Sequence, residues 1–597
     1  MGIYEHMTDT SGMGTLLLLI VPMVGFAVAY NTYGKYLARK IFKIDPQAKV
    51  PSCEYNDGVD FVPTKKGIIF GHHFTSIAGT GPIVGPAIGI IWGWVPAILW
   101  VLLGSIFMGA VHDMGTLVVS MRNDGKSISE IAARYINARV RLIFFVVVFF
   151  TLLLVIAVFG VIIATVFSKF PSSVIPVWLQ IPIAIGLGHA VYKKNASVPI
   201  ATAAAVIGMY ICIGIGAWVQ ANWPQACMLK PIGSMPGTGV WTIVLLIYAW
   251  IASTLPVTTL LQPRDYINAW QLFIMMGLLI AGIIAAAAGG MEIVAPAINK
   301  SVNNPGSDIP SMWPMMFVTI ACGAISGFHS LVASGTSPKQ VANEKDVQFI
   351  GYGSMLLEGM LAVLVIICVS AGIGIAYELT VNGSEQVLTG RAAWDGLYSS
   401  WKSTGGGALD AVVQGAANIL SRIGLNTTIG VTLMGVFIAS FAGTTLDTTV
   451  RIQRYVISEL AGDLKIPFMS NRWTATTFAV LTAAALAFMA GPDGAGAKIL
   501  WPLFGSVNQL LAALALLVVT MYLKTKGGKK FIYTAVPCVL ILTVTCCAII
   551  TNEINYYNDQ KWVLFSIGGG IFILSMWMVV ETATVFVKGV KIKENVE

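Results

Sequence analysis

Charged residues are scarce in this chain, and their scarcity excludes an ordinary soluble protein. Only 11% of the 597 residues are Asp, Glu, Lys or Arg, whereas 56% are hydrophobic. Soluble domains contain about 25% charged residues. The mean hydropathy is +0.78, and no polar run is long enough for a separate soluble domain. These features predict a polytopic membrane protein.

Several motifs of enzymes and nucleic-acid-binding proteins are missing. The sequence has no Walker loop, no HExxH motif and no GxGxxG before a helix, so ATP-driven transport is not expected. The eight cysteines form no CxxC pair, which argues against a zinc site or metal cluster. No basic run is interleaved with aromatic residues, so no nucleic-acid partner is expected. We predict a non-enzyme without a cofactor, whose partners are the lipid bilayer and a small-molecule substrate; the oligomeric state stays open.

Long apolar stretches recur along the whole chain. About fifteen of them suit the roughly 20 residues that a bilayer requires, which predicts an all-α polytopic protein. These stretches are 14–34, 67–93, 94–120, 142–168, 174–191, 198–219, 239–262, 268–288, 312–334, 350–376, 427–450, 474–491, 499–522, 531–551 and 563–587. A further stretch, 408–420, is too short to span and is predicted to be interfacial or re-entrant. With the N-terminus outside, the inside loops hold 28 of the 36 Lys and Arg residues, so we predict a cytoplasmic C-terminus.

The stretch 67–93 has features that a simple anchor does not need. It contains His72 and His73, and Gly79-Thr80-Gly81-Pro82 interrupts it near its middle. Irregular backbone persists in a bilayer only where it is buried in protein or lines a wet cavity. The N–H groups freed at the start of the outer half-helix lie at a positive dipole end and suit a carboxylate.

A second interruption is predicted at Ser253-Thr254-Leu255-Pro256, within 239–262. Spans two to eleven then divide into five plus five, which predicts an inverted-repeat (LeuT-like) core with broken first helices and flanking helices. The hydroxyls of the second break are expected to face the first. We assign 1–66 to an N-terminal span and loop, 67–473 to the transport core, and 474–597 to accessory helices. The predicted substrate-binding residues are His72, His73, Ala78, Gly79, Thr80, Gly81, Thr254, Pro256 and Val257.

Ionisable residues inside membrane spans are costly and therefore informative. The predicted coupling residues are Asp113, Ser326, His329, Ser330, Glu358 and Asp447. In 312–334, Ser326, His329 and Ser330 are expected on one helical face; the hydroxyls favour Na⁺ at Ser326 and Ser330, whereas the histidine favours a proton. His112 and Asp113 resemble the acid–base pair of a relay. The proton is our first choice of coupling ion, Na⁺ the alternative, and no other metal is predicted.

Two further ionisable pairs have predicted structural roles. Asp447 and Arg451 are four residues apart, the spacing of a helical ion pair, which would be structural; if Asp447 faces the cavity instead, we expect it to take a proton. Arg264 and Asp265 end the stretch 239–262 and are expected to act as a cytoplasmic gate or loop lock.

Several segments together resemble the carbon starvation protein A family. They are Asn56-Asp57-Gly58-Val59-Asp60, Val62-Pro63-Thr64, Gly71-His72-His73-Phe74, Gly79-Thr80-Gly81-Pro82, Gln262-Pro263-Arg264-Asp265-Tyr266, Ile320-Ala321-Cys322-Gly323, Ser326-Gly327-Phe328-His329, Gly335-Thr336-Ser337-Pro338-Lys339, Ile350-Gly351-Tyr352-Gly353 and Leu500-Trp501-Pro502-Leu503-Phe504-Gly505. The resemblance runs in order from about residue 30 to 520. Two positions depart from it: Thr80 stands where a small residue is common, and His112 replaces a neutral polar residue.

The resemblance implies a bacterial inner-membrane carrier that is induced on carbon starvation. Members are described as importing peptides, and some as pyruvate symporters driven by protons. Our leading hypothesis is a secondary active symporter for a small carboxylate such as pyruvate, and the alternative is a peptide transporter. A membrane nutrient sensor is a weaker hypothesis, because a sensor needs an output domain.

Overall fold

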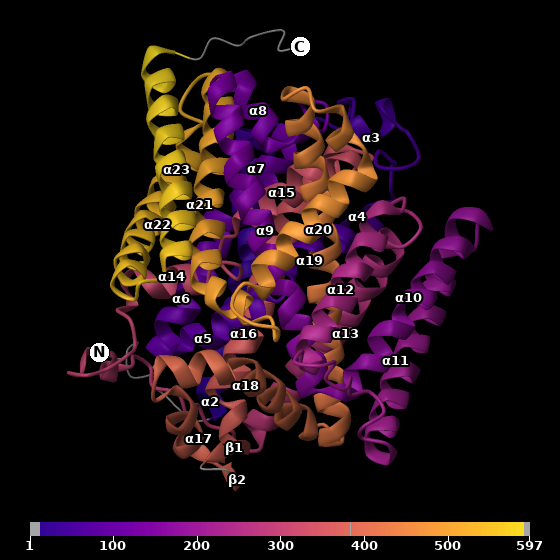
Figure 1. Cartoon of the computed structure of the whole chain (residues 1–597), viewed down its shortest axis with the longest axis vertical. Coiled ribbons are helices and arrows are strands. Elements are labelled where there is room, and N and C mark those ends of the chain that lie inside the picture. Colours follow the sequence, from indigo (N-terminus) through magenta and orange to yellow (C-terminus); the bar gives the residue numbers. More distant parts are fainter. Residues whose placement is uncertain (1–11, 382–383, 590–597) are drawn as a thin grey trace.

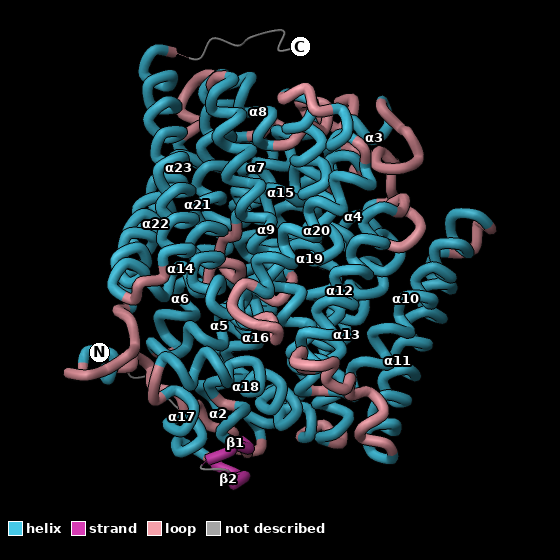
Figure 2. Tube along the Cα trace, in the orientation of Figure 1, coloured by secondary structure: helices cyan, strands magenta, loops and turns pink. Residues whose placement is uncertain are grey.

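The computed structural model describes residues 12–381 and 384–589, which form a helical bundle (Figure 1). Figure 2 shows helix along most of the described chain, long loops at both ends of the bundle, and the two strands confined to one end. Thirteen helical stretches within the described residues are long and apolar enough to cross a membrane. They coincide with thirteen of the fifteen predicted stretches, so the all-α polytopic fold is confirmed.

The boundaries of the elements are as follows. The helices of the first half are α2 (Gly12–Ala29), α3 (Pro51–Glu54), α4 (Lys66–Ala78), α5 (Gly81–Gly89), α6 (Trp94–Gly104), α7 (Ala110–Met121), α8 (Ile128–Tyr135), α9 (Ala138–Lys169), α10 (Val174–Gly188), α11 (Val198–Asn222), α12 (Gly237–Thr254) and α13 (Leu261–Ala288). Those of the second half are α14 (Met312–Thr319), α15 (Gly327–Gly335), α16 (Ser354–Ser370), α17 (Gly390–Tyr398), α18 (Trp401–Ser421), α19 (Thr427–Asp463), α20 (Arg472–Phe488), α21 (Ala495–Thr525), α22 (Ile532–Asn558) and α23 (Trp562–Lys588). The strands β1 (Tyr377–Val381) and β2 (Ser384–Leu388) form an antiparallel hairpin.

Two predicted spans differ from continuous membrane helices. The stretch 312–334 is interrupted, because α14 ends at Thr319 and α15 begins only at Gly327. The stretch 474–491 corresponds to α20, which has 17 residues. The prediction of one broken helix over 239–262 is wrong: α12 ends at Thr254, and α13 starts at Leu261 after a short loop.

The two longest helices, α9 and α19, pack along each other through the middle of the bundle (Figure 1). Each begins at an asparagine whose side-chain oxygen accepts a backbone N–H of the first turn, Asn137 for α9 and Asn426 for α19. Such N-caps contribute about 1 kcal/mol each. Helices α4, α12, α20 and α21 pack against one or both members of this pair, whereas α10 and α11 lie at one edge.

The two ends of the bundle carry different elements. At one end lie α3, α8 and the end of α23, and at the other lie α17, α18 and the hairpin (Figure 1). The short apolar stretch 408–420 is part of α18, which packs against α5, α16 and α19. Tyr398 is the last residue of α17, and its hydroxyl donates to the Ala87 carbonyl of α5 at 2.7 Å. Thus α17 and α18 cover the far end of α5.

The two interrupted helices approach each other through glycines. Gly81, Gly85 and Gly89 recur every fourth residue and line one face of α5. A Cβ atom at Gly81 would lie 2.3 Å from Cys322 Sγ, and one at Gly85 would lie 2.5 Å from the Thr319 carbonyl oxygen. Small residues at this spacing allow close helix packing in membranes. The α5 backbone therefore rests directly against the break between α14 and α15.

We expect the substitution Gly85→Ala to destabilise the protein by about 1–3 kcal/mol, because the new methyl group meets backbone that cannot rotate away. Thermal unfolding of the purified protein measures the effect. Gly277→Ala is the matched control, since nothing lies within 4 Å of a Cβ atom there. Equal unfolding temperatures for both variants would show that the α5 contact is not tight.

Candidate functional site

The predicted interruption at Gly79 is confirmed. Helix α4 ends at Ala78, Gly79 has a φ of +36°, and α5 begins at Gly81. A side chain at Gly79 would be strained, and its Cβ would lie 2.6 Å from Thr445 Oγ1 of α19. The Thr80 hydroxyl is buried and has no hydrogen-bond partner in the described structure. An unpartnered hydroxyl at a helix break is available to a ligand.

The element that faces this break is the segment 320–326, between α14 and α15. The side chain of Asn508, on α21, holds the start of α15: its Oδ1 accepts the Phe328 N–H at 2.8 Å. Its Nδ2 donates to Ser326 Oγ at 3.0 Å. A cavity of about 40 Å³ lies here, lined by Gly81, Thr319, Cys322, Trp401, Phe504 and Asn508 among others.

This cavity is far smaller than typical small-molecule sites of roughly 300 Å³ or more. Gly81, the first residue of α5, and Thr319, the last of α14, line it, and so does Asn508, which holds the start of α15. The positive end of the half-helix α5 thus lies at the cavity, which suits an anionic group. A substrate larger than a few water molecules needs the two breaks to move apart.

The expectation that Thr254, Pro256 and Val257 face the first break is wrong. The Thr254 hydroxyl donates to the Ile251 carbonyl at 2.8 Å, within its own helix. The Val257 N–H donates to the Val59 carbonyl at 3.3 Å, so this loop packs on the segment that precedes α4. The Pro256 break lies after the end of α12, and for this reason it cannot interrupt a span.

The expected helical face of Ser326, His329 and Ser330 is also wrong, because Ser326 precedes α15 and has extended backbone (φ −127°, ψ 133°). Its hydroxyl is bonded to Asn508, and the Ser330 hydroxyl donates to the Gly327 carbonyl at 2.6 Å. Within the described ranges, no group of three or more His, Cys, Asp or Glu side chains is arranged to hold a metal ion. Sodium at Ser326 and Ser330 stays a prediction.

The structure brings four predicted titratable side chains from three helices into one buried line. Asp113 of α7 lies between two histidines: its Oδ1 is 2.8 Å from His112 Nδ1, and its Oδ2 is 3.0 Å from His329 Nδ1. On the other side of the imidazole, His329 Nε2 is 3.2 Å from Glu358 Oε2 of α16. All four side chains are fully buried.

This geometry assigns a role to each group. An ionised Asp113 accepts at both oxygens, so it holds a proton on the Nδ1 of His329. The Nε2 of the same ring lies 3.2 Å from Glu358 Oε2, within ion-pair distance but without a hydrogen bond, so this end of the line is where a proton can be gained or lost. The line is therefore able to carry one exchangeable proton next to the N-terminus of α15.

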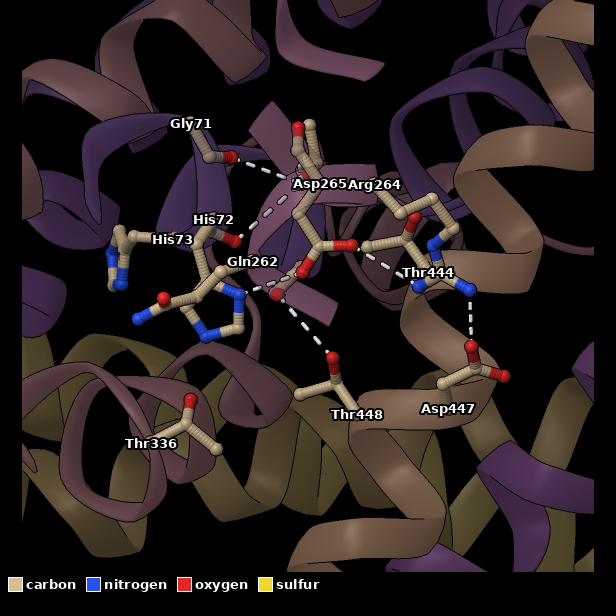
Figure 3. Close-up of polar contacts among 12 residues, drawn as sticks. Gly71, His72, His73, Gln262, Arg264, Asp265, Thr336, Thr444, Asp447 and Thr448 are labelled. Atoms are coloured by element: carbon tan, nitrogen blue, oxygen red, sulfur yellow. Dashed lines mark hydrogen bonds and ion pairs between the residues drawn. The ribbon is translucent and has the colours of Figure 1, made fainter. Parts of the chain in front are cut away.

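A second buried network links α4, α13 and α19 (Figure 3). His72 Nδ1 is 2.6 Å from Asp265 Oδ2, and Asp265 Oδ1 accepts from Arg264 at 3.1 Å. Arg264 also forms an ion pair with Asp447, and the Tyr248 hydroxyl donates to Asp447 at 3.0 Å. Arg264 and Asp265 are thus buried members of the site; the sequence placed them in a gate or loop.

The predicted ion pair between Asp447 and Arg451 is absent from the described structure, because Asp447 pairs with Arg264 instead. Arg451 pairs with Asp60 at 3.1 Å and donates to the Leu255 carbonyl. The Tyr455 hydroxyl also donates to Asp60, at 2.6 Å. Burial alone would raise the pKa of the Asp60 carboxyl, but the Arg451 guanidinium and the Tyr455 hydroxyl outweigh it and hold that pKa below its usual value. The segment before α4 is thereby pinned to α19 at the α3/α8 end.

His73 lies between the two networks. Its ring points away from that of His72 (Figure 3), and its Nδ1 is 2.7 Å from the Ser337 hydroxyl. It also interacts electrostatically with Asp113, His329 and His72. The predicted site residues of α4 therefore face both networks, one histidine for each.

The sequence did not predict that four residues, Arg264, Asp265, Asn508 and Cys322, belong to the site. Arg264 and Asp265 follow Pro263 and were placed outside a helix, although their position next to a long apolar run was the available signal. Asn508 and Cys322 lie inside apolar stretches and carry no pattern of their own. The Gly81-Gly85-Gly89 spacing was the available signal for the packing surface of α5, and the sequence analysis did not use it.

The fold and the site together define the class of this protein. Two interrupted helices meet beside a buried line of titratable groups in a multi-pass helical bundle. Residues 14–548 match the model of the family described as Carbon starvation protein CstA, and the chain belongs to this family. Its relatives are named as transporters, and the chain is a membrane transporter.

The comparisons include relatives with different named substrates. The chain is 33% identical over 587 residues to the "Peptide transporter CstA" of Helicobacter pylori (strain J99), covering 92% of this chain and 83% of the relative. It is 30% identical over 600 residues to the "Pyruvate/proton symporter BtsT" of Escherichia coli, covering 90% of this chain and 81% of that relative. A solved structure of MhsT in complex with L-phenylalanine is 12% identical, covers 82% of this chain and 98% of its own, and gives a TM-score of 0.48.

Proposed function

We propose that this protein is a proton-coupled symporter that imports a small carboxylate nutrient, with pyruvate as the first candidate. One observation carries the proposal. His329 belongs to the buried proton line, and it follows Phe328, whose N–H donates to Asn508 in the wall of the cavity. A proton that binds there alters the charge beside the proposed substrate site, so the two binding events are coupled.

The cavity favours a small anion as substrate. The N-terminus of the half-helix α5 lies at its wall, and few polar side chains line it, which suits a compact monocarboxylate. The relative from Escherichia coli is named a pyruvate/proton symporter. The relative from Helicobacter pylori is named a peptide transporter, and it supports short peptides as the second candidate. A peptide also offers a carboxylate to the same helix end.

The proposal includes an inverted repeat. We assign α4/α5 and α14/α15 as the equivalent broken helices, and α9 and α19 as the equivalent long helices. The contacts of α9 with α19 and of α5 with α14 support this pairing. The repeat core then extends through α21, past the predicted boundary at 473. We place the protein in the bacterial inner membrane with the α3/α8 end in the cytoplasm, the end that the excess of basic loops predicts.

The decisive measurement is labelled pyruvate uptake into proteoliposomes under an imposed proton gradient, with an alanyl dipeptide as competitor. We expect concentrative pyruvate uptake that collapses when a protonophore dissipates the gradient and that the dipeptide does not inhibit. Inhibition by the dipeptide would move the assignment to peptides. Uptake that follows a sodium gradient instead of the proton gradient would contradict the assigned coupling ion.

A further inference from the structure

A basic cavity lies at the α3/α8 end, away from the two buried networks. Its volume is about 400 Å³, and its rim carries Lys43, Lys526 and Lys530. Lys43 follows the first membrane-spanning stretch, which ends at Ile41, and the other two lie between α21 and α22. The rim therefore lies where these spans leave the bilayer.

The three ammonium groups have no acidic partner. None of them forms an ion pair within the described residues. Burial and the ammonium groups of Lys43 and Lys526 lower the pKa of Lys530, so both of these lysines repel it. Like charges that gather without a counter-charge lose free energy unless an anion joins them.

The rest of the lining carries one net negative charge, from Arg122, Glu344 and Asp45, so that with the three lysines the cavity has a net charge of about +2. Arg122 forms an ion pair with Glu344 and donates to the carbonyls of Phe42 and Lys43 at 2.9 and 3.0 Å. These bonds fix Lys43 in a left-handed conformation, with a φ of +49°. Asp45 also lines the cavity, and one of its oxygens accepts the Gln47 N–H. Arg122 thus holds the backbone at Lys43, and the ammonium groups of the three lysines are available to bind an anion.

We propose that this cavity binds a phosphate-bearing anion, either the headgroup of an anionic phospholipid or a free phosphate. Lysine is a point-charge ligand for phosphate, and basic pockets between helices at the cytoplasmic surface are suited to lipid headgroups. The site is independent of the transport proposal, because it shares no residue with the cavity at Gly81 or with either titratable network.

Binding of fluorescent short-chain phosphatidylglycerol to the purified full-length protein tests the proposal, with phosphatidylcholine and inorganic phosphate as the other arms. The triple variant K43Q/K526Q/K530Q should weaken phosphatidylglycerol binding by roughly 100-fold, about fivefold per lysine. The control K193Q/K194Q/K465Q removes the same charge from exposed lysines of other loops and should leave binding within about fivefold.

The outcomes separate the two sources of phosphate. Saturable phosphatidylglycerol binding that inorganic phosphate does not displace assigns a lipid headgroup, and displacement by inorganic phosphate assigns a free phosphate. An equal loss of phosphatidylglycerol affinity in the triple variant and in the control would mean diffuse attraction to the surface charge and would contradict the proposed site. Size-exclusion profiles and unfolding temperatures establish that each variant is folded.

Discussion

Replacing Asp113 by Asn is expected to lower proton-driven uptake by roughly 100-fold or more, as loss of a carboxylate that fixes a histidine tautomer does in enzymes. An amide has one acceptor oxygen and one donor nitrogen, so it cannot accept from both His112 and His329. One ring must then change tautomer, and the Nε2 of His329 no longer meets Glu358 in the required state. The measurement is initial uptake into proteoliposomes with and without a proton gradient.

The expected defect is in coupling and leaves binding intact. Exchange of labelled for unlabelled substrate without a gradient should persist in Asp113→Asn, and Glu358→Gln should behave in the same way. Asp395→Asn is the matched control, because Asp395 is exposed on α17 and, among the described residues, forms an ion pair only with Arg391. If Asp113→Asn accumulates substrate as well as Asp395→Asn does, the buried line does not carry the proton.

The second large effect concerns the network of Arg264. Removing one partner of a buried ion pair costs about 3–5 kcal/mol, because the other charge is left unpaired. We expect Arg264→Gln to lower the stability more, since it removes the guanidinium that pairs with both Asp265 and Asp447. Asp447→Asn leaves Arg264 paired with Asp265. Thermal unfolding of the purified variants measures the order.

The double variant R264Q/D447N distinguishes a charge effect from a packing effect. It should recover part of the stability lost in Arg264→Gln, because one unpaired carboxylate is removed. The exposed pair Arg391–Asp395 provides the control, and breaking it should cost only about 0.5 kcal/mol. Additive losses in the double variant would show that Arg264 and Asp447 do not interact as described.

Both predictions depend on contacts between helices that are distant in the sequence. Asp113 and His329 are joined across 216 positions, and Arg264 and Asp447 across 183. The sequence marked Asp113, His329, Glu358 and Asp447 because ionisable groups are costly in a membrane. It did not reveal which of them pair, since a local spacing rule matched Asp447 to the wrong arginine.

The sequence by itself determined that this is a polytopic helical membrane protein, where most of its spans lie, and that one helix breaks at Gly79. Composition, apolar run length and the backbone preferences of glycine and proline are local properties, and each can be read within a few turns of helix. Only the tertiary structure decided which segment faces that break. Thr254 and Pro256 looked like a second interruption because hydroxyl and proline residues also end helices, whereas the real one at 320–326 contains no proline. Its irregular backbone is held by Asn508 from another helix, and a bond supplied by a distant residue leaves no mark on the local sequence.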